Sequence, residues 1–257
     1  MKNNTSSKNN LNEWYVDLLR FTGFPTPDFQ IQEPTWWQYI VGEPSETKVF
    51  HPRKGQFQDK GIFREGELIL KIEPFRIDWI YRVIKSEVDQ IKSSLGLLSE
   101  ASTSFNDSIK KWFEVDNFPT LQRVAFGAFL IQPVEDRKSG YEVISKYLIN
   151  SVKLDPESSS DFLYQINRPR DSKLNFPELK INRLTKWSVQ TYKHFGVAVG
   201  EESKTVYESE ESFACRLELD INTIMNIKNR FNSADSRNIF NELINLGLEI
   251  AEKGDIK

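Results

Sequence analysis

The chain has 257 residues, of which 39% are hydrophobic, 12% aromatic and 28% charged. This composition predicts a globular protein with a sizeable core and excludes a fully disordered chain. With 34 basic and 37 acidic residues the net charge is −3, which excludes a bulk electrostatic attraction to nucleic acid. The single Cys215 excludes an intrachain disulfide and a multi-cysteine zinc site. No apolar run approaches the about 20 residues of a membrane-spanning helix, so we expect a cytoplasmic protein without a membrane partner.

The first part of the chain predicts a tail, two strands and a loop. Residues 1–10 are polar and low in complexity, which is typical of a disordered tail. The hydrophobic pattern of 12–24 predicts a strand, and 35–41, TWWQYIV, predict a second one whose adjacent tryptophans point to opposite faces. Residues 51–61 contain Pro, Gly and charges and are predicted to form a loop.

The clearest periodic signal lies in 67–82, ELILKIEPFRIDWIYR. Apolar and polar residues alternate there with a period of two, which predicts a β-strand. The apolar positions change parity at Glu73 and Pro74, which predicts a bulge or a bend. A two-residue hairpin is the less favoured interpretation, because the common hairpin turns need a positive φ that proline cannot adopt.

The middle of the chain predicts helices around one buried strand. Residues 86–98 have a helix-like spacing of apolar residues, and 105–115 carry a stronger apolar stripe, with Asn and Asp near the predicted start. Residues 121–131, LQRVAFGAFLI, predict a buried strand in which Gly127 permits close backbone approach. Residues 139–152 predict a short amphipathic helix.

The last third of the chain returns to strands and ends in a helix. Residues 153–183 are irregular apart from a strand predicted over DFLYQIN. Residues 184–199 predict a strand with one break, and the acidic segment 208–211 predicts a turn. In 213–221, FACRLELDI, apolar residues alternate with Arg, Glu and Asp, and 234–253 predict a final helix.

These elements predict an α+β fold with a mainly antiparallel sheet packed by a few helices. We expect 11–257 to form one domain. Each half contains several strands, then one strongly charged strand, then a helix, so a duplication with halves 11–120 and 121–257 is an alternative organisation. The pattern Arg, apolar, acid, apolar recurs at 76–79 and 216–219, although so short a pattern also recurs by chance.

The charged positions of the two alternating strands are the first candidate site. Arg76 and Asp78 share one strand face, as do Arg216, Glu218 and Asp220. If the two strands lie near each other, these five charges line one surface, where carboxylates bind a cation and arginines bind an anion. The alternative is a solvent-exposed face with ordinary cross-strand ion pairs.

Two basic segments are the second candidate site. Proline-flanked Arg168 and Arg170 lie near Tyr164 and Phe176 in the sequence, a combination that contacts phosphate and stacks bases. An ordinary solvated loop is the alternative, because nearby acidic residues offset the charge. The basic residues of the two segments are Arg53, Lys54, Lys60, Arg168, Arg170 and Lys173. Cys215 falls on the apolar face of its strand and is predicted to be a small core residue rather than a nucleophile.

Four segments of the chain also carry a resemblance: the strand that ends in RIDW, the segment QRVAFGAFL, the segment INRPR, and LELDI with the helix after it. Together they resemble a sporadically distributed family of uncharacterised prokaryotic proteins of about this length. Patchy distribution of this kind often accompanies mobile or defence-associated operons, so the resemblance implies that context. It implies no activity, cofactor or site residue.

The function that these patterns favour is non-enzymatic: a scaffold or adaptor subunit that binds another protein in a bacterial multi-protein system, such as one for antiviral defence. It rests on the lack of a complete catalytic motif and on the richness in Trp and Phe. One alternative is a divalent-metal enzyme acting on nucleic acid, with Asp78, Glu218 and Asp220 holding the ion. Another is a nucleic-acid sensor that uses the basic loops. We expect no cofactor, and homo-oligomerisation is left open.

Overall fold

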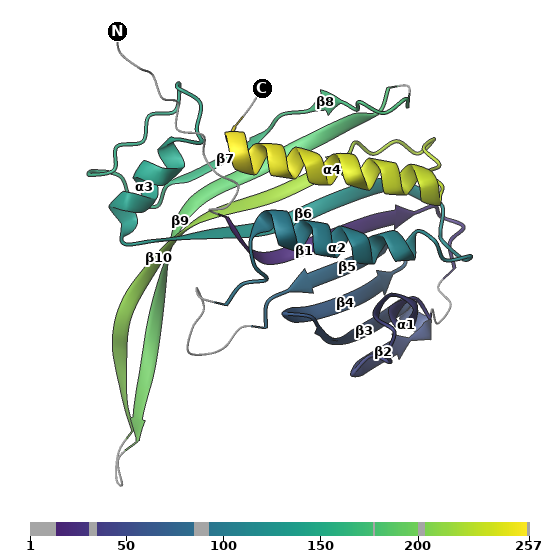
Figure 1. Cartoon of the computed structure of the whole chain (residues 1–257), viewed down its shortest axis with the longest axis horizontal. Coiled ribbons are helices and arrows are strands. Elements are labelled where there is room, and N and C mark those ends of the chain that lie inside the picture. The colour runs from purple at the N-terminus through teal and green to yellow at the C-terminus, as the bar shows by residue number, and fades with distance from the viewer. Residues whose placement is uncertain (1–13, 31–34, 85–92, 177, 200–203, 256–257) are drawn as a thin grey trace.

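The computed structural model describes residues 14–30, 35–84, 93–176, 178–199 and 204–255, without the side chains of 194–199 and 204–210. The described residues form one antiparallel sheet of ten strands, with the two longest helices against one of its faces (Figure 1). The predicted α+β fold with a mainly antiparallel sheet is confirmed. None of the helices in these ranges combines the length and the apolar character that a membrane crossing requires.

The order of the strands across the sheet is β2-β3-β4-β5-β1-β6-β10-β9-β7, and β8 also pairs with β9. The strands are β1 (Tyr15–Pro25), β2 (Thr47–His51), β3 (Gln56–Phe63), β4 (Gly66–Glu73), β5 (Arg76–Arg82), β6 (Leu121–Val134), β7 (Leu163–Asn167), β8 (Arg170–Asp171), β9 (Lys180–Val199) and β10 (Lys204–Thr223). The helices are α1 (Trp36–Val41), the short 3-10 helix η2 (Pro52–Lys54), α2 (Leu98–Trp112), α3 (Arg137–Ser145) and α4 (Ser233–Lys253).

The first strands of the two halves lie together at the centre of the sheet. β1 pairs with β6, and each of them also pairs with the last strand of its own half, β5 or β10. In both halves that last strand leads to a helix on the same face of the sheet, α2 or α4 (Figure 1). The halves therefore have a similar order of elements, and the duplication of 11–120 as 121–257 stays a prediction.

The core lies between the sheet and the helices α2 and α4. Aromatic rings fill it: Phe21 of β1 contacts Trp112 at a centroid distance of 5.2 Å and Phe240 of α4 at 4.9 Å. Trp112 also packs on Phe118 at 4.7 Å. An Asn106–Asn241 hydrogen bond of 2.9 Å joins the two helices directly. The richness in Phe and Trp is thus used largely in the core.

A hairpin arm projects from the body of the protein. β9 and β10 have 20 residues each, and their far ends extend beyond β6 and β7 as a two-stranded ribbon (Figure 1). The predicted turn at 208–211 is wrong, and so is the predicted break in 184–199. β10 stays paired with β9 on both sides of a register shift between Glu208 and Glu211, because one strand can absorb extra residues as a bulge.

The segment predicted as a strand at 35–41 is the helix α1, so that prediction is wrong. Both tryptophans are buried on the same side of the molecule, with Trp36 on Trp112 at 5.4 Å and Trp37 on Trp79 at 6.4 Å. Two adjacent residues of a strand cannot do this, since their side chains alternate. Packing against the core has overridden the local strand propensity, and Gly42 ends the helix with a φ of 90°.

Two further predictions about the first half are wrong. The parity change at 67–82 is a two-residue hairpin: β4 and β5 pair from Glu67↔Arg82 to Glu73↔Arg76, around Pro74 and Phe75. Neither turn residue has a positive φ, so this is not one of the common hairpin turns, and proline suits its first position. The segment 51–61, predicted as a loop, is largely strand, because β2 and β3 pair around η2.

Helix α2 begins before the predicted start at 105, and the apolar stripe of 105–115 is buried as expected. In the Ser-rich segment before 105, the hydroxyl of Ser102 donates to the carbonyl of Leu98 in the preceding turn, so this buried polar side chain has a partner within the helix. The helix predicted over 86–98 lies mostly outside the described residues. The strand β6 and the final helix α4 agree with prediction within a few residues.

Candidate functional site on the open face of the sheet

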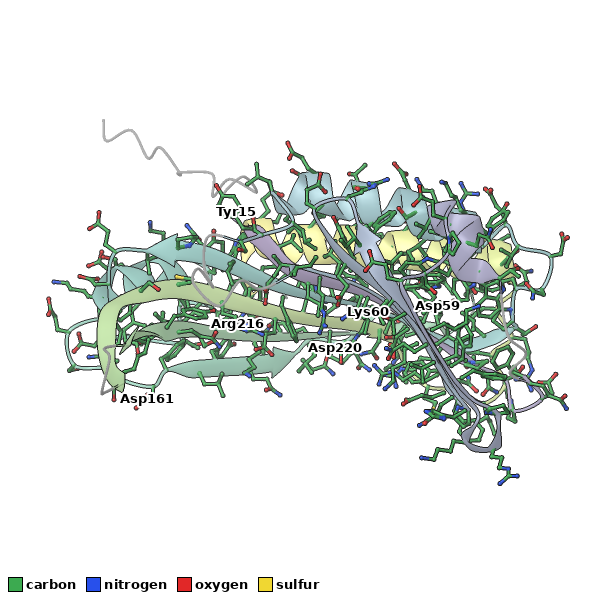
Figure 2. All side chains as sticks on the ribbon, turned by 90° about the horizontal axis from the view of Figure 1, so that it is seen from below. Tyr15, Asp59, Lys60, Asp161, Arg216 and Asp220 are labelled. Atoms are coloured by element: carbon green, nitrogen blue, oxygen red, sulfur yellow. The ribbon has the colours of Figure 1, made fainter. Side chains whose placement is uncertain are left out.

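One face of the sheet is not covered by α2 and α4, and we call it the open face. Figure 2 views the sheet from the side, with the helices on one side and Lys60, Arg216 and Asp220 toward the other. Because side chains alternate along a strand, the buried apolar residues of β5 and β10 face the helices and the charged ones face away. The charged residues of the open face include Asp17, Arg20, Lys60, Glu67, Lys71, Glu73, Arg76, Asp78, Arg82, Arg123, Lys186, Arg216, Glu218 and Asp220.

The five charges predicted as one site lie on this same face but in two groups. Arg76 and Asp78 are on β5, and Arg216, Glu218 and Asp220 are on β10, with β1 and β6 between them. Three strand spacings separate the two groups, or roughly 14 Å. The prediction that the two strands form one surface therefore holds only for the open face as a whole.

The group on β5 is a closed network. The guanidinium of Arg76 donates to both carboxylate oxygens of Asp78, at 2.6 and 3.1 Å, and Thr22 Oγ1 donates to the same carboxylate at 2.6 Å. The hydrogen bond to Asp78 raises the pKa of Arg76, and the charge of Asp220 adds to this effect from across the sheet. Asp78 is buried and its oxygens are engaged, so it is a fixed element of the face.

The group on β10 is also paired. Arg216 donates to Glu218 at 2.8 Å, and Lys186 of β9 lies 3.4 Å from the same carboxylate. The guanidinium of Arg216 lies over the ring of Phe129 of β6, 4.5 Å from its centroid. Asp220 accepts a hydrogen bond of 3.0 Å from Asn222. An arginine stacked on an aromatic ring presents its other flat side to whatever binds there.

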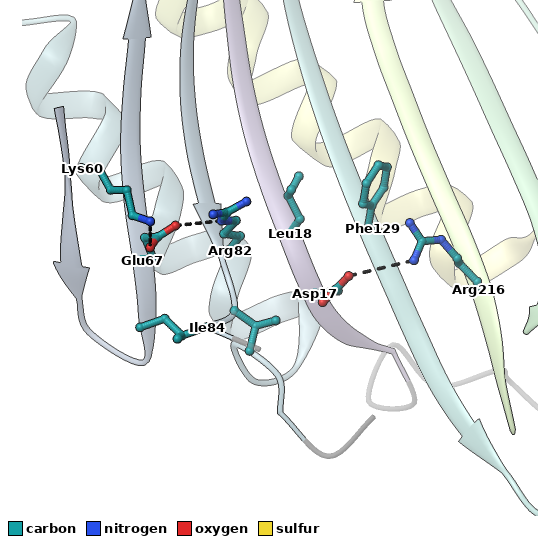
Figure 3. Close-up of a pocket in the computed structure, with 9 residues that line it drawn as sticks. Asp17, Leu18, Lys60, Glu67, Arg82, Ile84, Phe129 and Arg216 are labelled. Atoms are coloured by element: carbon teal, nitrogen blue, oxygen red, sulfur yellow. Dashed lines mark hydrogen bonds and ion pairs between the residues drawn. The ribbon is translucent and has the colours of Figure 1, made fainter. Parts of the chain in front are cut away.

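A groove of about 540 Å³ opens on this face beside Arg82, the last residue of β5, and Arg216 of the β10 group also lines it (Figure 3). Leu18 and Phe129, which are cross-strand neighbours by register, supply its apolar floor. Charged residues stand on either side of that floor, and Val83 and Ile84 also line the groove. The charged residues that line the groove are Asp17, Lys60, Glu67, Arg82 and Arg216.

The charges on either side of the groove are ion-paired. On one side Glu67 binds Lys60 at 2.7 Å and Arg82 at 2.8 Å, and on the other Arg216 and Asp17 lie 4.0 Å apart (Figure 3). Burial by itself would raise the pKa of Glu67, but the hydrogen bonds from Lys60 and Arg82 outweigh it and hold that pKa below its usual value. Glu67 is therefore ionised at neutral pH, and the groove presents both signs of charge around an apolar floor.

No metal site emerges from the described part of the chain, where no three His, Cys, Asp or Glu residues are placed to hold an ion. The chain matches no family model, no curated protein and no solved structure. The geometry of the open face is therefore the observation that bears on function.

The basic segment 168–173 lies against α4, away from the open face. Arg168 makes a bidentate ion pair with Asp255, which raises the pKa of Arg168. Arg170 lies 3.6 Å from Glu249 of α4. Both arginines predicted to contact phosphate are thus engaged with carboxylates of the same chain. Of the first basic segment, Arg53 and Lys54 lie on η2, and only Lys60 lines the groove.

Cys215 is fully buried on the helix-facing side of β10, as predicted for a core residue. Burial raises the pKa of its thiol to about 12, and its Sγ donates to the carbonyl of Gly140 at 3.3 Å. We therefore expect a thiol reagent at pH 8 to leave the folded protein unlabelled and to label one thiol after denaturation in urea. Stoichiometric labelling of the native protein within minutes would contradict this buried environment.

Of the groove residues, Arg216 and Lys60 are candidates from the sequence, in two different predicted sites, and the others are not identified there. Leu18 and Phe129 appeared only as members of predicted strands, and Lys60 was assigned to a loop. Glu67 and Arg82 stand at the two ends of the strongest periodic segment, and the hairpin at Pro74 brings them together. Their separation of 15 residues around a central turn was the available signal, and the bulge interpretation concealed it.

Proposed function

We propose that this protein is a non-enzymatic subunit that binds another protein, and that the groove on the open face receives a segment of that partner. The observation that carries the proposal is the groove itself, an apolar floor with ion-paired residues of both signs on either side. Protein interfaces combine an apolar centre with polar surroundings, and they are enriched in aromatic residues and arginine.

Apolar side chains beside the groove support the proposal. Ile84 lines it and is 53% exposed, and Ile62 of β3, the cross-strand neighbour of Glu67, is 63% exposed. When a partner covers such side chains, the free energy falls by about 25 cal/mol for each Å² of apolar surface removed from water. In the context that the resemblance implies, the partner is encoded by an adjacent gene of a bacterial operon, for instance one for antiviral defence.

No specific observation favours the metal-dependent enzyme or the nucleic-acid sensor. The carboxylates named for the metal ion lie in two separate groups, and Asp78 and Glu218 are bound to arginines. The arginines named for phosphate, Arg168 and Arg170, are bound to carboxylates of their own chain. These functions, and homo-oligomerisation, stay predictions.

The proposal is tested by co-expressing the tagged chain with the products of its neighbouring genes and comparing two matched variants. Ile84→Glu places a charge at the groove and is expected to reduce the retained partner at least tenfold. Ile227→Glu makes the same change at a residue that is 71% exposed and outside the groove, and it should leave the complex intact.

A wild-type chain that retains none of these products, with elution as a monomer, would refute the protein-binding function. A complex that survives Ile84→Glu unchanged would refute the groove as its site.

A further inference from the structure

Arg20 occupies the centre of the open face. It lies in the middle of β1, where its cross-strand neighbours are Ile80 of β5 and Gly127 of β6, and Gly127 in turn pairs with Asp220. The guanidinium lies against Gly127: a Cβ at that position would stand 3.3 Å from both Nε and Nη2 of Arg20. The sequence predicted a close backbone approach at Gly127, and the group that lies there is the side chain of Arg20.

Arg20 differs from the other arginines around it. Arg76, Arg82 and Arg216 each bind a carboxylate of the same sheet face. Arg20 is half-buried, and its guanidinium makes no hydrogen bond and no ion pair within the described part of the chain. A guanidinium carries five N–H donors in a rigid fork that matches a carboxylate or a phosphate. Its contact with Gly127 leaves those donors without a hydrogen-bond acceptor among the described residues.

The groove begins two residues away along the same seam of the sheet. Leu18 precedes Arg20 by two positions on β1, and Phe129 follows Gly127 by two on β6, so both lie on the open face beside the arginine. Alternate residues of an extended chain are about 6.6–6.8 Å apart. An extended segment along the β1–β6 seam therefore places one side chain over Arg20 and the next but one over the apolar floor.

We infer that Arg20 binds a carboxylate of the partner, and this inference rests on the proposed protein-binding function. The carboxylate belongs to an extended segment of the partner in which an acidic residue lies two positions from an apolar residue. The apolar side chain enters the groove over Leu18 and Phe129. The carboxylate lies over Gly127 and receives a bidentate pair of hydrogen bonds from Arg20.

The surroundings of Arg20 favour a single carboxylate over a nucleic-acid strand. Asp78, Glu218 and Asp220 share the face with it, and a polyanion with a phosphate on every nucleotide would meet these carboxylates as well as the arginine. A peptide can place one negative charge at Arg20 and other groups elsewhere. The mixed charges of the face are complementary to such a segment.

The test uses the full-length protein and two hexapeptides with blocked termini, Thr-Glu-Thr-Val-Thr-Thr and the same peptide with Gln in place of Glu. Each peptide is titrated into the protein while NMR follows the side-chain Nε–H signals of the arginines. We expect the Glu peptide to shift the Arg20 signal and to bind about tenfold more tightly than the Gln peptide. Arg20→Gln should remove that preference, and Arg20→Lys should remove most of it because an ammonium group cannot form the bidentate pair. Arg53→Gln, which removes one positive charge from the exposed η2, should leave the preference unchanged.

Thermal unfolding checks the variants, and Arg20→Gln should melt within a few degrees of the wild type because no described hydrogen bond is lost. Equal binding of the two peptides would overturn the inference, and the protein-binding function would still stand if Ile84→Glu releases the partner. Stronger Arg20-dependent binding of a phosphoserine peptide, or of a single-stranded oligonucleotide, would also overturn the choice of a carboxylate.

Discussion

Replacing Trp112 with alanine is expected to lower the free energy of unfolding by about 3–5 kcal/mol, the range measured when large buried aromatic residues are truncated. Trp112 is fully buried at the end of α2. Its ring contacts Phe21 of β1, Trp36 of α1 and Trp79 of β5, at centroid distances of 5.2, 5.4 and 6.2 Å. It therefore joins the helices α1 and α2 to β1 and β5, which are the first and last strands in the first half of the chain.

The effect is measured by urea denaturation followed by circular dichroism. Phe75→Ala is the matched control, because Phe75 is 66% exposed in the β4–β5 turn and its removal should change stability by about 0.5 kcal/mol or less. A loss below about 1 kcal/mol for Trp112→Ala would mean that the aromatic core is loosely packed, which its short ring distances contradict.

Replacing Asp255 with asparagine is expected to destabilise the protein by about 2–4 kcal/mol at pH 7, because it leaves buried positive charge without its counter-ion. The side chain of Asp255 is only 2% exposed. It binds Arg168 through two oxygens and accepts a hydrogen bond of 2.5 Å from Tyr164. Arg183 is also buried nearby. Burial is the main cause that lowers the pKa of Arg183, and the positive charge of Arg170 is the next.

The pH dependence of this variant provides a second measurement. Burial opposes ionisation of Asp255, but the hydrogen bonds from Arg168 and Tyr164 outweigh it and lower its pKa from the ordinary value of 3.8. A lowered pKa in the folded state means that the stabilisation is complete above the unfolded value and is lost as the pH falls through the folded value. The stability difference between wild type and Asp255→Asn should therefore be constant from pH 7 to about 5 and shrink below pH 4.

Asp107→Asn serves as the control for a surface ion pair. Asp107 binds Lys110 at 2.8 Å on the outer side of α2, and its side chain is 57% exposed. The expected loss is below about 1 kcal/mol. Equal effects of the two substitutions would show that the cluster around Asp255 is open to solvent.

The sequence predicted the strand face on which a residue lies better than it predicted which strands are neighbours in the sheet. Alternation placed Arg76, Asp78, Arg216, Glu218 and Asp220 correctly on faces opposite to apolar residues, because alternation is a local property of extended chain. The strand order could not be read in this way, and it is the insertion of β1 and β6 between β5 and β10 that separates the two charged groups. Arg20 gave no local signal, since its significance depends on a glycine more than 100 residues later.

The errors in the first half have a common physical origin. Trp36 and Trp37 have strand propensity, yet the core binds both rings from one side, which only a helix permits. Pro74 argued against the usual hairpin turns, yet a turn without positive φ joins β4 to β5. In both cases long-range packing or pairing outweighed a local preference.

The place of β1 at the centre of the sheet has a consequence for folding while the chain is being synthesised. Residues 14–112 carry β1 to β5 and α2, and they are synthesised before β6. Until β6, Leu121–Val134, has been synthesised, one edge of β1 has unpaired backbone groups, and Phe21 lacks its contact with Phe240. An unpaired edge is a template for pairing with other chains. Completion of the centre of the sheet therefore depends on contacts between distant parts of the chain, which is typical of slow folding and of a need for protection during synthesis.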